Sequence, residues 1–152
     1  MFLPAGEKQF KFWVLRRNGT PNINIANIFG ISRQAVSRAL LVMDKRIEET
    51  LLEMANANQI EVEKISSKKG VLFGKSVPFK TNAIIFISAK HGIQVWYEHE
   101  GDCSSCDRYR ECIELLWDFA EEIQVKLKSS EDPTKIADEL FLKLKEMTES
   151  EK

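Results

Sequence analysis

The sequence predicts an α+β fold in which helices flank a small antiparallel sheet. Apolar residues recur at three- and four-residue steps over residues 7–17 and 32–55, which is the spacing of a buried helix face. Over residues 59–99 apolar and polar side chains alternate, as in half-buried strands. Helical spacing returns over residues 107–127 and 133–148, which are expected to form a C-terminal helical hairpin.

Within the predicted sheet, the clearest strands are residues 82–89 and 93–99. Shorter strands are expected at 71–73 and 77–79, on either side of Gly74. A turn over residues 66–70 precedes them, and its two lysines, Lys68 and Lys69, either contact phosphate or form a solvated turn.

The charge of the chain is unevenly distributed. Residues 1–46 carry a net charge of +6 and residues 98–152 a net charge of −8, although the whole chain has a net charge of only −1. Such asymmetry indicates a basic binding region and an acidic tail. We therefore expect an N-terminal domain at 1–58 with one long helix. A second part at 59–152 holds the sheet and the C-terminal helices and is expected to serve dimerisation or sensing.

Residues 24–42 have the pattern of a helix-turn-helix motif, within the stretch NINIANIFGISRQAVSRALLV that begins at Asn22. Ala26 is small enough for close contact between two helices, and Gly30 turns the chain without a side-chain clash. Ser32 lies where the N-cap of the second helix belongs. The apolar anchors between the two helices are Ile25, Phe29, Ile31, Val36 and Leu40.

The early turns of that second helix carry the side chains suited to DNA. Arg and Gln have forked donors and acceptors that match base edges in the major groove. We expect Gln34 and Arg38 to reach bases, and phosphate contacts to come from Ser32, Arg33 or Ser37. Further cations are candidates for phosphate attraction, namely Arg16, Arg17 and Lys45, with Lys8, Lys11 and Arg46. The alternative is an ordinary helical hairpin whose charged residues only solvate one face.

The stretch IANIFGISRQAVSRAL resembles the helix-turn-helix of bacterial and archaeal transcription regulators. Together with a hairpin and a cysteine-containing C-terminal part, it resembles archaeal regulators akin to the Tfx group. The resemblance implies binding to double-stranded DNA and covers about twenty residues. We therefore expect a sequence-specific DNA-binding transcription regulator.

The apolar stripe of residues 32–55 is longer than a small DNA-binding domain can cover. It packs on later strands and helices of the same chain, pairs with a second copy through its distal half, or does both. Because helix-turn-helix proteins commonly bind as two-fold dimers, we expect a homodimer.

The three cysteines lie within ten residues, at Cys103, Cys106 and Cys112, and His99 precedes them. This spacing joins a strand end, a loop and a helix start, where four side chains can converge on a metal. Zinc accepts three thiolates and one imidazole in tetrahedral geometry, so we expect zinc. An iron–sulfur cluster, a disulfide and reduced thiols remain open, since C-x2-C-x5-C also resembles a cluster-binding segment of certain nuclease-like proteins.

Two other functions fit the same residues. In one, the His/Cys cluster is a metal or redox sensor that controls DNA binding. In the other, the protein is a protein-interaction adaptor that keeps the helix-turn-helix fold without binding DNA. An operator affinity that changes with oxidant or chelator would mark the sensor, and salt-dependent retention on DNA would discriminate the adaptor.

Several classes of protein are disfavoured by the sequence. No apolar run reaches transmembrane length, and MFLPAGEKQF lacks the basic start and apolar core of a signal peptide. We therefore expect a cytoplasmic protein with no membrane partner. No Gly-rich phosphate loop, Ser/His/Asp set or supported carboxylate pair is present in the sequence, and no βαβ pattern surrounds C-x2-C. An enzyme is therefore not expected.

Overall fold

The computed structural model of the protein describes residues 6–99, 106–128 and 132–149. Helices and strands are both present, which confirms the α+β class. The chain divides into two compact units, Met1–Trp96 and Tyr97–Lys152.

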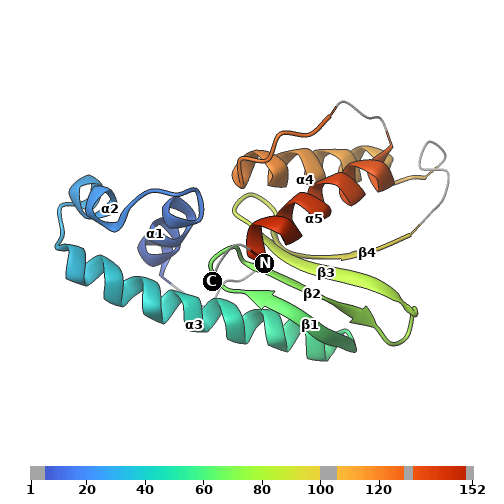
Figure 1. Ribbon diagram of the computed structural model, residues 1–152, viewed down its shortest axis with the longest axis horizontal. Coiled ribbons are helices and arrows are strands. Elements are labelled where there is room, and N and C mark those ends of the chain that lie inside the picture. The colour runs from blue at the N-terminus through green and yellow to red at the C-terminus, as the bar shows by residue number, and fades with distance from the viewer. Residues whose placement is uncertain (1–5, 100–105, 129–131, 150–152) are drawn as a thin grey trace. The chain divides into compact units, whose positions relative to one another are not determined.

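The first unit joins three helices to a four-stranded sheet. The strand order is β1-β2-β3-β4, and the pairs β1/β2 and β2/β3 are antiparallel. In Figure 1 the first two helices lie beside the N-terminal half of the long third helix, and the sheet lies beside its C-terminal half. The elements are α1 (Glu7–Arg17), α2 (Asn22–Phe29), α3 (Arg33–Ala57), β1 (Ile60–Ser66), β2 (Val71–Ser76), β3 (Thr81–Ser88) and β4 (Gly92–Tyr97).

One face of α3 is buried along nearly its whole length. It packs on α1 and α2 near its start and on β1 and β3 near its end. Of the two roles expected for its apolar stripe, packing within the chain is the one observed, so this stripe does not face a second copy. The buried residues are Val36, Leu40, Met43, Ile47, Leu51 and Ala55.

The division between the units therefore falls after the sheet and does not coincide with the predicted boundary at residue 58. The physical reason is that α3 supplies apolar side chains to both the helical part and the sheet, which gives the two a shared core.

The turn between β1 and β2 is held against α1. The indole of Trp13 is fully buried, and its Nε1 donates to the carbonyl oxygen of Ser67 at 2.9 Å. Gly70 has φ of +70°, and a Cβ there would lie 2.6 Å from the Trp13 ring. Lys69 Nζ donates to the carbonyl oxygen of Arg17 at 3.3 Å. Of the two lysines in the turn, Lys69 is thus engaged with the fold and Lys68 is exposed.

The prediction of a short strand at 77–79 is wrong, because these residues form a turn. β2 runs uninterrupted through Gly74 to Ser76, and the following residues turn the chain into β3. Phe79 N donates to Ser76 Oγ at 3.1 Å, and Lys80 adopts a left-handed φ of +54°. Pro78 has no N–H for a strand ladder, which favours the turn.

The second unit contains two amphipathic helices that pack on each other, α4 (Tyr109–Glu122) and α5 (Pro133–Glu149). α4 ends before the predicted residue 127, because Gln124 adopts a left-handed φ of +59°. α5 begins as predicted, with Thr134 N donating to Asp132 Oδ1 at 3.0 Å. In the described part of the chain, no helix is both long and apolar enough to cross a membrane.

Candidate nucleic-acid interface

The corner between α2 and α3 has the local geometry that its sequence predicts. Gly30 ends α2 in the left-handed region, with φ of +66°. Ile31 N donates to the carbonyl oxygen of Ala26 at 3.1 Å, which closes the last turn. Ser32 Oγ then accepts from Ala35 N at 3.1 Å and caps α3. The corner therefore fixes how the first turn of α3 projects.

The start of α2 is not capped by a side chain. Pro21 occupies the N-cap position, and α2 begins at Asn22 without a side-chain cap. Asn22 Nδ2 instead donates to Ser37 Oγ at 3.3 Å, which links the first turn of α2 to the second turn of α3. The sequence contains both residues, but nothing in its periodicity indicates that they meet.

The side chains predicted to face DNA gather on the first two turns of α3. Ser32, Arg33, Gln34 and Arg38 are exposed, whereas Ser37 is half-buried. Arg33, Gln34, Ser37 and Arg38 line one open depression of the surface. Neither arginine forms an ion pair with a carboxylate in the residues that the structure covers. Their guanidinium donors are therefore available to an external acceptor.

This group can offer three kinds of contact to nucleic acid. The arginines present forked donors to guanine edges or phosphate oxygens, and Gln34 presents both a donor and an acceptor, as an adenine edge requires. The first N–H groups of α3 carry partial positive charge, which adds attraction for phosphate at the same end of the helix.

Arg16, which was predicted to attract phosphate, is engaged within the fold. Its Nη1 donates to Asp44 Oδ2 at 2.9 Å, and its Nη2 pairs with Asp44 Oδ1. Asp44 lies on α3, so this bidentate pair links α1 to α3. Both side chains are largely shielded from water.

Arg17 is buried, with 4% of its surface exposed. Its Nη1 donates to the carbonyl oxygen of Ile87 at 2.7 Å, and its guanidinium carbon lies 4.6 Å from the centre of the Trp13 ring. Its position joins α1 to β3, so Arg17 stabilises the fold and does not face DNA. Lys45, the third predicted phosphate ligand, is exposed on α3.

The structure describes three members of the predicted metal site. His99 is exposed, with Nδ1 2.7 Å from the carbonyl oxygen of Tyr97. Cys106 is exposed and Cys112 is half-buried on α4, while Cys103 lies outside the described residues. The described ranges bring together no group of three potential metal ligands. Zinc, and the less favoured iron–sulfur cluster, stay predictions.

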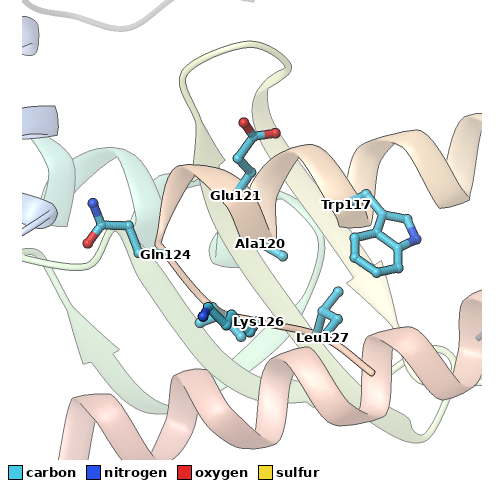
Figure 2. A pocket seen from close by; sticks show the side chains of 7 residues that line it. Trp117, Ala120, Glu121, Gln124, Lys126 and Leu127 are labelled. Carbon is cyan, nitrogen blue, oxygen red and sulfur yellow. The ribbon is translucent and has the colours of Figure 1, made fainter. Parts of the chain in front are cut away.

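A second depression lies within the second unit, at the end of α4. Trp117 and Leu127 lie at one end of it and Gln124 lies at the other (Figure 2). Its lining is mainly apolar, with one carboxylate from Glu121 and one ammonium group from Lys126. These residue types suit packing against an apolar group and supply no arrangement matching a nucleic-acid backbone.

Comparison of the chain with protein-family models, with curated proteins and with solved structures finds no significant match. The functional argument therefore depends on the geometry of the site itself.

Proposed function

We propose that this protein is a sequence-specific DNA-binding regulator of transcription, with α2 and α3 as its helix-turn-helix. One observation carries this proposal. Arg33, Gln34, Ser37 and Arg38 share one exposed depression on the first two turns of a capped helix. In helix-turn-helix proteins, the early residues of the second helix contact base edges in the major groove.

The two faces of the early helix suggest separate roles. Gln34 and Arg38 are four residues apart, so they project from the same side of α3 and read neighbouring bases. Arg33 is likewise four residues before Ser37, on an adjoining side. Together with Ser32 at the helix start, this second pair supplies phosphate contacts that position the helix in the groove. The regulator acts as a homodimer on two half-sites.

The first experiment selects a preferred duplex from a random DNA pool and measures its affinity at several salt concentrations. Arg38→Ala is expected to weaken binding to that duplex by about 1–3 kcal/mol and to relax the base preference at one position. The matched control is Arg110→Ala, which removes an exposed arginine from α4 in the second unit.

The control is expected to leave both affinity and base preference unchanged. A protein that selects no sequence, or an Arg38→Ala variant that binds as the parent does, would overturn the proposed function.

A further inference from the structure

The solvent-exposed side of α3, next to its buried stripe, carries a ridge of side chains. Leu41 is 70% exposed and Leu52 is 41% exposed, and both lie on this side of the helix. Lys45 and Glu48 lie between them along the helix and are also exposed. The steps of four, three and four residues place all four side chains on one line. We call these residues the α3 ridge.

The order of the side chains makes the α3 ridge complementary to itself. Leu41 and Leu52 are equally far from the midpoint between Arg46 and Ile47, and so are Lys45 and Glu48. When two copies of α3 lie antiparallel about that midpoint, Leu41 meets the partner's Leu52, and Lys45 meets the partner's Glu48. Two-fold symmetry repeats both contacts, as a closed dimer requires.

We propose that a second copy of this chain docks antiparallel on the α3 ridge. This inference rests on the proposed function and deepens it, because it assigns the surface through which the regulator dimerises. It also assigns Lys45 to the partner subunit, where the sequence had suggested phosphate.

Charge selects the antiparallel arrangement over the parallel one. Parallel pairing would place Lys45 against the partner's Lys45 and Glu48 against the partner's Glu48, which is unfavourable. Neither side chain has an ion-pair partner within the part of the chain that the structure describes. Each is therefore available to the opposite charge on a second copy.

The geometry of α3 relates this dimer to DNA. In each copy of α3, the residues assigned to DNA are centred about eleven positions before the midpoint, so about twenty-two positions separate the two sets. At a rise of about 1.5 Å per residue, the two sets lie about 33 Å apart along the helix axes. One turn of duplex DNA is about 34–36 Å. Gln34 and Arg38 continue the line of the α3 ridge toward the start of the helix, at the same steps of three and four residues. Packed helices diverge from their crossing point, so a crossing over residues 41–52 that opens before residue 38 leaves these two side chains to DNA.

The α3 ridge is short, so the dimer is expected to be weak without DNA. Two leucines in each chain bury far less than the about 1,600 Å² of a standard interface. We expect a dissociation constant of about 1–100 µM. Sedimentation of the full chain over this range should show a mass rising from 17.5 kDa toward twice that value.

Charge reversal at Lys45 and Glu48 provides the decisive test. Lys45→Glu and Glu48→Lys should each raise the dimer dissociation constant about tenfold, because each places like charges opposite one another twice. An equimolar mixture of the two variants should form a heterodimer with at least the parent affinity. An ion pair between Lys45 and Glu48 of the same helix would not be restored by mixing the two variants.

Leu41→Asp tests the apolar ends of the α3 ridge and should raise the dissociation constant about a hundredfold. Leu142→Asp is the matched control, because Leu142 is 60% exposed on α5 and lies outside the α3 ridge. Circular dichroism verifies that each variant is folded. The inference is overturned if the parent stays monomeric up to 500 µM, or if the charge variants fail to recover on mixing.

These measurements contain no DNA, so they separate this inference from the proposed function. A monomer that still selects a DNA sequence would refute the α3 ridge and leave the DNA-binding role of α2 and α3 intact. A ridge dimer that selects no sequence would refute only the regulator.

Discussion

Two pairs of arginines in the first unit have contrasting surroundings. Arg16 and Arg17, at the end of α1, are bound to Asp44 and to the carbonyl oxygen of Ile87. Arg33 and Arg38, at the start of α3, are exposed beside Gln34. All four contribute equally to the basic charge of the N-terminal region. The contrast shows that a local excess of positive charge does not identify which cations are available to DNA.

The difference follows from what surrounds each pair. α1 lies between α3 and the turn of the sheet, so cations on its last turn are desolvated and need internal acceptors. The first turns of α3 project beyond the corner with α2, where water remains the alternative partner. If substitutions at Arg16 and Arg17 weakened DNA binding, or if substitutions at Arg33 and Arg38 destabilised the fold, this comparison would fail.

The largest expected effect is on folding stability at Arg17. Arg17→Ala should lower the free energy of unfolding by about 2–3 kcal/mol, because it leaves the carbonyl oxygen of Ile87 without its donor and removes the contact with Trp13. Denaturant unfolding measures the change. Arg38→Ala is the paired variant and should change stability by less than about 0.5 kcal/mol.

A smaller effect is expected at Arg16, whose pair with Asp44 is mostly shielded from water. Arg16→Ala should lower the free energy of unfolding by about 1 kcal/mol. It should leave the salt dependence of DNA binding unchanged, whereas Arg33→Ala should reduce the slope because it removes a phosphate contact. A reduced slope in Arg16→Ala would contradict its assignment to the fold.

The smallest expected effect is on thermal stability and concerns one carboxylate on α5, that of Glu139. Glu139 accepts from Lys143 Nζ at 2.8 Å and from Lys128 N at 3.1 Å, and these hydrogen bonds lower its pKa. Stability from a lowered pKa is present above the unfolded pKa and is lost as pH falls through the folded one. Glu139→Gln should therefore reduce the unfolding midpoint slightly at pH 7 and less in acid.

Glu146→Gln on the same helix is the control for Glu139→Gln, because Glu146 is exposed. Thermal melts at pH 7 and pH 3 compare the two variants. An equal effect of Glu139→Gln at both pH values would show that the carboxylate charge is not what stabilises this helix.

Local rules in the sequence predict the α2–α3 corner well. Gly30 and Ser32 each satisfy a backbone requirement within four residues, so their roles follow from neighbours along the chain. Helical periodicity likewise predicts the buried stripe of α3. Once the start of that helix is known, the sequence also predicts that these side chains lie together on its first two turns, namely Arg33, Gln34, Ser37 and Arg38.

Contacts between distant residues could not be predicted in the same way. Arg17 meets Ile87 seventy residues later, and Trp13 meets Ser67 across 54 residues. Composition gives no signal for either contact. The strand expected at 77–79 failed for a local reason, since Pro78 and the left-handed Lys80 favour a turn over continued pairing.

The unbroken course of α3 has a mechanical consequence. Its 25 residues form a rod of about 37 Å that starts beside the proposed DNA contacts and ends with two residues between it and β1. Asp44 holds this rod against α1, and the apolar stripe of the rod packs on the neighbouring helices and strands. Because α1 is tied to the sheet through Arg17 and to α3 through Asp44, the first turns of α3 keep a fixed direction relative to the sheet. In a dimer joined at the middle of two such rods, a change in their crossing angle would change the distance between the two reading ends, as opening scissors separates their tips.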